Sequence, residues 1–204
     1  AQKEMDEKIT AYPEGTMWGS MPVSGFYVRH VKGLQMSDIK IITEDEDMRP
    51  LAKFDDVLNL YINNLQTNDI YKGDCILDLN NVKRARILNL DFPEAIKIPW
   101  VNIKGIETEK IIIKPIDRIE GKDLIKSDSS VKVDAIDLVI NSSKPDGTTL
   151  CTDLIQKAIA ICSGSSGGKV IVPTGVFLTG TIYLRSNTTL NLEDGASFIG
   201  KQKN

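Results

Sequence analysis

The sequence predicts an all-β protein, a right-handed parallel β-helix (a solenoid of stacked coils) with one capping α-helix. Three observations indicate this fold. Apolar residues recur at the same spacing in four stretches of residues 28–113, polar residues fall at one fixed place in those stretches, and residues 152–162 have the pattern of a single amphipathic helix. A chain of 204 residues, 41% of them hydrophobic, is large enough to bury a core.

Each of the four stretches has six positions that are expected to point into the core, separated by steps of 3, 3, 2, 3 and 2 residues. A step of two is the alternation of a β-strand, and a step of three is interpreted as a strand that turns a corner. Strands and corners repeated at this interval predict stacked coils with right-handed connections. The copies begin at residues 28, 54, 79 and 100, so their spacings are 26, 25 and 21 residues. The alternative is a leucine-rich repeat, but connections such as residues 43–50 are too short or too broken for helical returns.

Stacking predicts that equivalent positions of the copies form columns. An inward column is expected at the second position, made of Val31, Val57, Val82 and Ile103. The residue before it is polar in every copy and suits a tight corner. These expected corner residues are His30, Asp56, Asn81 and Asn102.

Two adjacent carboxylates, Asp55 and Asp56, could act as a catalytic acid and base. The repeat gives another interpretation, in which Asp56 is a corner residue and Asp55 faces solvent, with no partner histidine in the pattern. His30 is likewise interpreted as a corner or cleft-wall residue rather than a ligand or base.

The repeat stops near residue 115. Residues 1–115 are predicted to be coils, 116–130 a linker, and 131–204 a helix with further coils. Thr152 is the expected N-cap of the helix, whose apolar stripe should cover an open solenoid end. The stripe consists of Ile155, Ala158, Ile159 and Cys162. Strand alternation is expected at Val170/Val172, Ile182/Leu184, Leu190/Leu192 and Ala196/Phe198.

Composition excludes several function classes. The net charge of −3 and the absence of a basic patch argue against nucleic-acid binding, and no apolar run has the roughly 18 residues of a membrane span. Three cysteines and one histidine have no metal-ligand spacing, so we expect no metal, no cofactor and no disulfide, with Cys75, Cys151 and Cys162 as small buried hydrophobes. The Ala-Gln start suits a cleaved chain and a secreted or periplasmic location.

Residues 145–200 carry the stretches PDGTTLCTDLIQKAIAIC, GGKVIVPTGVFLTG and LRSNTTLNLEDGASFIG, which resemble the N-terminal region of the polygalacturonase family, glycoside hydrolase family 28. YPEGTMWGSMPVSGFYVRHVKGL (12–34) and RPLAKFDDV (49–57) resemble the C-terminal part of bacterial members. The matches of the first region are Asp146, Gly147, Ile155, Gln156, Ala158, Ile159, Pro173, Gly175, Gly180, Ser186, Asn187, Gly195 and Gly200.

The resemblance implies right-handed β-helix enzymes that hydrolyse pectic polysaccharides with aspartates in an inverting mechanism. Here the order of the two regions is inverted. The Asn-Thr-Asp, Gly-His-Gly and Arg-Ile-Lys motifs do not occur, and the Asp-Asp pair at 55–56 lies in the C-terminal-type region. No catalytic residue is therefore carried over. We expect a fragment or rearranged part of a pectin-active glycoside hydrolase. The alternatives are a non-catalytic carbohydrate-binding or structural β-helix module and a pectate lyase, which would need a calcium-binding aspartate cluster.

Sugar contacts are expected from the region 12–30. Tyr12, Trp18 and Tyr27 could stack on sugar rings, Arg29 could pair with a uronate carboxylate, and His30 lies beside them in the sequence. The expected partner is a pectic, uronate-containing polysaccharide. Open solenoid ends could also lead to self-association.

Overall fold

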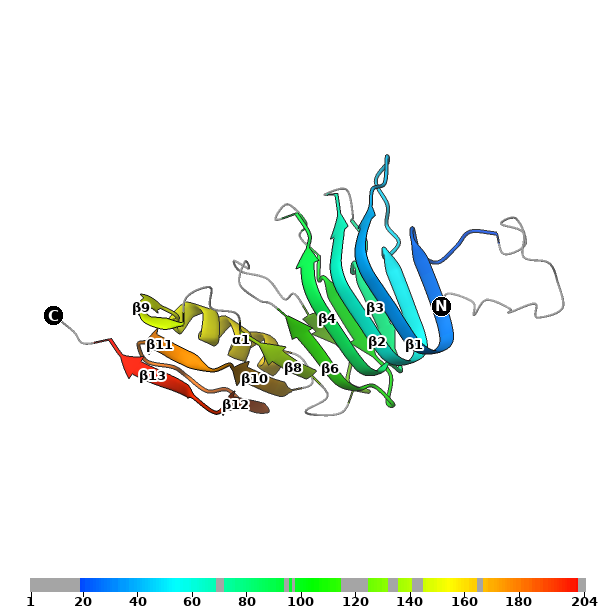
Figure 1. The fold of residues 1–204 in the computed structure, drawn as a ribbon. Coiled ribbons are helices and arrows are strands. Elements are labelled where there is room, and N and C mark those ends of the chain that lie inside the picture. Colours follow the sequence, from blue (N-terminus) through cyan, green and yellow to red (C-terminus); the bar gives the residue numbers. More distant parts are fainter. Residues whose placement is uncertain are drawn as a thin grey trace.

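The computed structural model describes residues 19–68, 72–93, 96, 98–114, 125–131, 136–140, 145–164 and 167–201. Within them the chain forms thirteen strands and one helix, and all paired strands are parallel. Figure 1 shows the strands stacked from β1 at one end of the molecule to β12 and β13 at the other. The prediction of an all-β parallel β-helix with one helix is confirmed.

The strands form three rows along the stack. Two long bent strands, β1 (Phe26–Ile41) and β2 (Ala52–Thr67), belong to rows one and two together. Row one continues with β3 (Leu77–Asn80), β5 (Val101–Lys104) and β7 (Ile125–Ser127). Row two continues with β4 (Lys83–Asp91), β6 (Glu109–Lys114), β8 (Ile136–Val139), β10 (Gly168–Val172) and β12 (Thr188–Leu192). Row three is β9 (Asp146–Leu150), β11 (Gly175–Thr179) and β13 (Ala196–Gly200).

Left-handed backbone conformations explain the steps of three in the repeat. In the first coil the positive-φ residues are His30, Gly33 and Asp38, and each lies directly before an apolar position of the repeat. One such residue turns the strand so that the next apolar side chain again points inward. Asn, Asp and Gly tolerate this conformation best. The three columns are His30, Asp56, Asn81 and Gly105; Gly33, Asn59, Arg84 and Lys110; and Asp38, Asn64 and Asn89.

The first three copies of the repeat stack as predicted, but the predicted alignment of the fourth copy with the third is wrong. Ile103 pairs with Leu79 and not with Val82. The place beside Val82 belongs to Thr108, which is fully buried and whose Oγ1 accepts a hydrogen bond from the Val82 N–H at 3.2 Å. Ile106, expected inside, is 68% exposed. The fourth coil turns between β5 and β6 at residues 105–108, so the apolar spacing predicted from Trp100 onward does not match the core positions of this coil.

The corner residue of the fourth copy is therefore Gly105 and not Asn102. Gly105 has φ +91°, and its amide donates to the Ser130 Oγ at 2.9 Å. Asn102 instead lies in β5, buried beside Asp78 of the preceding coil. A corner in this solenoid needs a left-handed backbone, whereas Asn102 occupies a regular strand position.

One sheet connects the two parts of the chain that the sequence separates. Strand β8 pairs with both β6 and β10, so row two runs without a break from β2 to β12. Strand β7 lies inside residues 116–130, the expected linker, and pairs with β5. Most other residues of that segment lie outside the described part, so the division into three regions stays a prediction.

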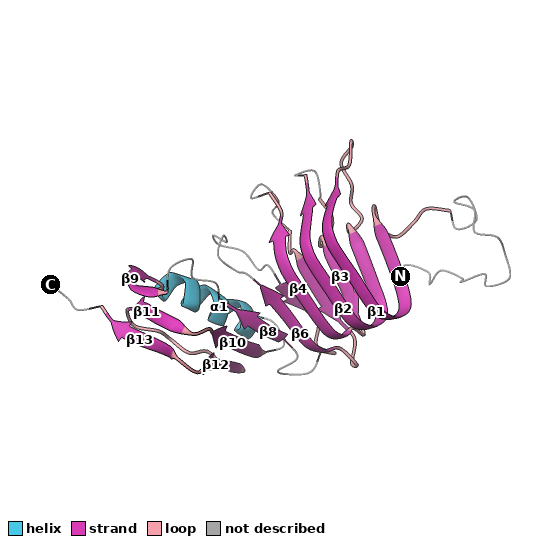
Figure 2. Cartoon of the chain, in the orientation of Figure 1, coloured by secondary structure: helices cyan, strands magenta, loops and turns pink. Residues whose placement is uncertain are grey.

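Helix α1 (Thr152–Gly164) is the predicted helix, and the four residues of its predicted stripe are each 0% exposed. It packs against β8, β10 and β12 and shares their hydrophobic core (Figure 2). The predicted N-cap is wrong. The first intrahelical bond runs from the Ile155 N–H to the Cys151 carbonyl, and the Thr152 Oγ1 accepts from the Gly180 N–H at 2.7 Å. The Thr152 side chain thus fixes a neighbouring segment of the solenoid.

The expected strand at Ile182 and Leu184 is also absent, since residues 180–185 have no strand assignment. The side-chain amide of Gln156 donates to the Tyr183 carbonyl and accepts from the Tyr183 N–H, both at 2.8 Å. The backbone of this segment is thus held by a helix side chain in place of a neighbouring strand.

Candidate functional site

Row one presents a polar face on the side opposite its core residues. Side chains alternate along a strand, so the residues between the apolar core positions form two columns that cross the coils in register. The first column is Tyr27, Lys53, Asp78, Asn102 and Lys126. The second is Arg29, Asp55, Asn80 and Lys104. We call these nine residues the polar face.

Hydrogen bonds between successive coils hold the polar face together. The Asn80 Nδ2 donates to the Asp55 Oδ1 at 2.8 Å, and the Asn102 Nδ2 donates to the Asp78 Oδ1 at 2.9 Å. The Lys104 Nζ lies 3.0 Å from the same Asp78 oxygen. Asp78 and Asn102 are only 7% and 6% exposed, and buried polar groups need such partners. Both aspartates of this face therefore serve as acceptors between coils.

Three of the five predicted sugar-contact residues lie together at one end of this face. The Arg29 guanidinium carbon lies 5.8 Å from the centre of the Tyr27 ring, within the range of a cation–π contact. The Arg29 Nη2 lies 3.4 Å from the His30 Nε2, and its Nε lies 3.9 Å from the Asp55 Oδ2. The other two predicted residues, Tyr12 and Trp18, lie outside the described residues.

The sequence interpretation missed Lys53. Its Nζ lies 5.6 Å from the centre of the Tyr27 ring, so Tyr27 has cations from two coils beside it. Lys53 is 26 residues after Tyr27, the spacing of the first two copies, and the register pairs the two residues directly. A comparison of the polar positions of the first two copies, as well as the apolar ones, could have identified Lys53 as the neighbour of Tyr27.

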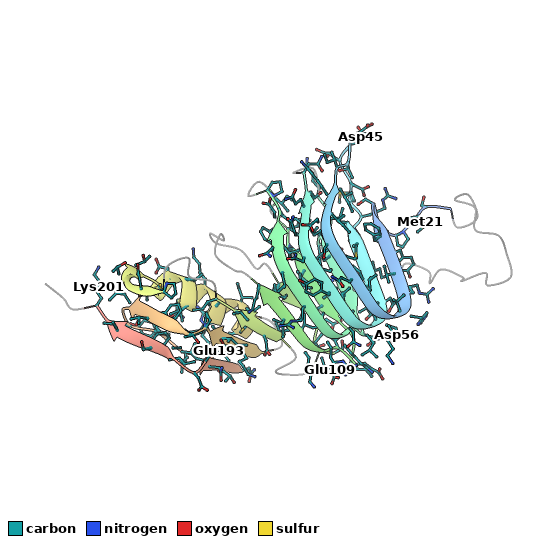
Figure 3. The ribbon with its side chains drawn as sticks, in the orientation of Figure 1. Met21, Asp45, Asp56, Glu109, Glu193 and Lys201 are labelled. Atoms are coloured by element: carbon teal, nitrogen blue, oxygen red, sulfur yellow. The ribbon has the colours of Figure 1, made fainter. Side chains whose placement is uncertain are left out.

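The adjacent carboxylates of Asp55 and Asp56 belong to different columns. Asp55 lies on the polar face, where its side chain is 20% exposed and accepts a hydrogen bond from Asn80, so it is only partly open to solvent. Asp56 is the expected corner residue, with φ +52°. It does have a histidine partner, contrary to expectation, since the His30 Nδ1 lies 2.7 Å from its Oδ2. Figure 3 shows Asp56 at the edge where the long strands bend.

Cys75 and Cys162 are not nucleophiles at neutral pH. All three cysteines of the chain are buried, as expected, and their thiols are free. Burial raises the pKa of the Cys75 thiol and of the Cys162 thiol to about 12, so both are protonated at neutral pH. Over the residues that the structure describes, no group of three or more His, Cys, Asp or Glu is placed to hold a metal ion. In the same part of the chain, no helix is long and apolar enough to cross a membrane.

The fold and this face define a class of protein, a parallel β-solenoid with a polar ladder along one row of strands. Over 70 residues the chain is 49% identical to the exo-poly-alpha-D-galacturonosidase of Dickeya chrysanthemi. The alignment covers 32% of this chain and 11% of that protein. No family model and no solved structure matches the chain. The similarity therefore relates part of the chain to a galacturonosidase.

Proposed function

We propose that this chain is a fragment or rearranged part of a pectin-active glycoside hydrolase of the polygalacturonase type, glycoside hydrolase family 28. The observation that carries this proposal is the 49% identity over 70 residues to an exo-poly-alpha-D-galacturonosidase. The parallel β-solenoid fold agrees with it. A secreted or periplasmic location would place the chain where an extracellular polysaccharide is present.

In this proposal the polar face binds a uronate-containing chain at its Tyr27 end. The exposed part of the Tyr27 ring stacks on a sugar, and Lys53 and Arg29 neutralise carboxylates. The Arg29 side chain is only 10% exposed and already contacts His30 and Asp55. Lys53 is therefore the more available cation for a ligand. Lys104 is bound to Asp78, which leaves Lys126 as a further exposed cation along the face.

The chain is proposed to bind pectic polysaccharide without hydrolysing it. Inverting hydrolysis needs an acid and a base about 6.5–9.5 Å apart on opposite sides of the scissile bond. On the polar face, Asp55 and Asp78 already accept hydrogen bonds from Asn80 and Asn102. The alternative is a purely structural module, which the same ladder of bonds between coils favours.

Calorimetry with oligogalacturonate tests the binding. We expect Lys53→Ala to weaken the affinity about tenfold, since a lost charge-assisted contact costs roughly 1.4 kcal/mol, and Arg29→Ala to weaken it less. Lys40→Ala is the matched control, because Lys40 is an exposed lysine of β1 outside the polar face. Equal affinity of all variants would remove the polar face from the site, and no binding at all would favour the structural module.

A reducing-sugar assay with polygalacturonate tests the absence of hydrolysis. We expect no product from the chain alone. Turnover that disappears in Asp55→Asn or Asp56→Asn would show that these carboxylates are catalytic. Turnover unaffected by both would place the catalytic groups elsewhere in the chain.

A further inference from the structure

Four cations lie on the outer face of two adjacent inner strands, β4 and β6. Side chains alternate along β4, so Ala85 and Ile87 point into the core and Arg86 points outward. The four cations are all exposed, and they are Arg84, Arg86, Lys110 and Lys114. Each of the two strands has a neighbour on both sides, with β2 before β4 and β8 after β6 (Figure 1). The exposure of this face therefore does not depend on the ends of the stack.

The register brings the four cations together from two coils. Arg84 and Lys110 occupy successive places in one corner column, and Lys114 pairs with Leu88. Adjacent strands are about 4.8 Å apart and residues two apart on one strand are about 6.6 Å apart, so the backbone of each cation lies within about 10 Å of another's. The sequence shows only the short basic run of residues 83–86, and the stacking of the coils adds the two lysines of β6.

In the described part of the chain, no carboxylate pairs with these cations. None of the four forms an ion pair, whereas Lys83 beside them is bound to Glu107 at 2.5 Å. Residues 84–88 and 110–114 and the facing residues 59–63 of β2 include no aspartate or glutamate. Like charges at facing positions destabilise a sheet, and a bound anion would relieve the repulsion between Arg84 and Lys110. Three acids border this area, and all lie outside it: Glu107, Glu109 and Asp137.

Tyr61 adds an aromatic surface to the same area. It points outward from β2, is half-buried and pairs with Arg86 in the register. Among the residues that the structure describes, no aromatic ring and no cation stacks on the Tyr61 ring. Two residues further along β2, the Asn63 Oδ1 accepts a hydrogen bond from the Asn89 Nδ2 at 2.8 Å, which leaves the Asn63 Nδ2 to donate to a ligand.

This combination of groups fits an acidic polysaccharide better than a nucleic acid. Arginine pairs with a carboxylate through two parallel hydrogen bonds. A tyrosine ring offers an apolar surface on which a sugar ring can stack. Binding to a DNA duplex commonly involves roughly 6–10 phosphate contacts, whereas this area has four cations in a chain of net charge −3.

We propose that these four cations and Tyr61, which we call the basic face, form a second binding site for a uronate-containing polysaccharide. The basic face lies on row two and shares no residue with the polar face of row one. The choice of a uronate rests on the proposed function, but the two faces can be tested separately. Two sites let one chain bind two segments of polymer at once, which raises its affinity for long polymers over short ones.

Calorimetry with a short oligogalacturonate at low salt tests the proposal. We expect the wild-type chain to bind two oligomers. The double variant Arg86→Gln/Lys110→Gln should bind one, because it removes a cation from each strand of the basic face and leaves the polar face intact. The matched control is Lys40→Gln/Lys157→Gln, which removes the same charge from exposed lysines outside both faces and should still bind two.

The identity of the ligand is tested in a Lys53→Ala background, in which the polar face is weakened. Tyr61→Leu keeps every charge and should weaken the remaining binding at least tenfold, because the ring is lost. A methyl-esterified oligogalacturonate has no carboxylate charge and should bind at least tenfold more weakly than the free acid. A DNA duplex of equal charge should also bind at least tenfold more weakly.

Four results would overturn the proposal. A wild-type chain that binds no oligomer has neither site. A double variant that binds as many oligomers as the wild type would exclude the basic face. Unchanged affinity in Tyr61→Leu would exclude stacking on the ring, and DNA bound as tightly as oligogalacturonate would make the face a nucleic-acid surface.

Failure of the polar face gives a different pattern. The wild-type chain would then bind one oligomer, Lys53→Ala would have no effect, and Arg86→Gln/Lys110→Gln would bind none. That outcome supports the basic face and removes the site suggested under the proposed function.

Discussion

The Nδ1 atom of His30 lies 2.7 Å from the Oδ2 atom of Asp56 in the next coil. Both residues have left-handed backbones, with φ of 54° and 52°. Their side chains are 50% and 60% exposed, and exposed ion pairs contribute only about 0–1 kcal/mol. The left-handed backbone costs an ordinary residue about 1–2 kcal/mol. The corner conformation, rather than the pair, should therefore dominate the contribution of His30 to stability.

Substitution at His30 separates these two effects. His30→Asn removes the ring but keeps a residue that tolerates the corner, and it should change the free energy of unfolding by less than about 0.5 kcal/mol. His30→Val adds a β-branched side chain at positive φ and should cost about 1–2 kcal/mol. Urea unfolding at neutral pH measures both values. Equal losses in the two variants would show that the contact with Asp56 carries the effect.

Two substitutions in the fourth coil distinguish the observed register from the one expected from the sequence. Ile106→Ser should be nearly neutral because Ile106 is 68% exposed. Thr108→Val should cost about 1–3 kcal/mol, because it leaves the buried Val82 N–H without its acceptor. The two free energies of unfolding are compared directly. A larger loss of unfolding free energy for Ile106→Ser than for Thr108→Val would support the alignment expected from the sequence, which places Ile106 in the core.

The success and the failure of the sequence prediction have one physical cause. Three coils share the same arrangement of strand and corner, so a fixed apolar spacing predicts their columns. In the fourth coil the residues between β5 and β6 form a different turn, and Ile106 at that turn looks like a core residue although exposed apolar residues are common. Lys53 was missed for a related reason, since contacts across coils become visible only after the register is known.

Two glycines at different corners of the solenoid should respond differently to substitution. A Cβ added at Gly105 would lie 2.2 Å from the Asn81 Oδ1 and 2.6 Å from the Asn81 N, whereas a Cβ at Gly33 would have no atom within 4 Å. Both have positive φ, 91° and 80°. Gly33→Ala should therefore cost about 1 kcal/mol for the backbone alone, and Gly105→Ala should cost more than about 2 kcal/mol. Similar losses would mean that Asn81 moves aside freely.

The buried stripe of α1 can be tested with one charge in two positions. Ile159 is fully buried, and Lys157 lies exposed on the same helix. Ile159→Asp places an unpaired carboxylate in the core and should cost more than about 3 kcal/mol. Lys157→Asp should change the free energy of unfolding by less than about 0.5 kcal/mol. An Ile159→Asp variant as stable as the parent would show that α1 does not cover the core.

Burial of the thiols predicts a loss of stability in alkali. The pKa values of Cys75 and Cys162 are raised to about 12 in the fold, whereas an unfolded thiol titrates near about 8.5. Between these values the folded chain keeps protons that the unfolded chain has lost, so the free energy of unfolding is unaffected below about pH 8.5 and falls as the pH rises toward about 12. In a Cys151→Ser background, the two remaining thiols should not react with Ellman's reagent at pH 8 until denaturant is added. Rapid reaction of the folded chain would show that at least one of them is accessible and ionised, and the alkaline loss of stability should then be correspondingly smaller.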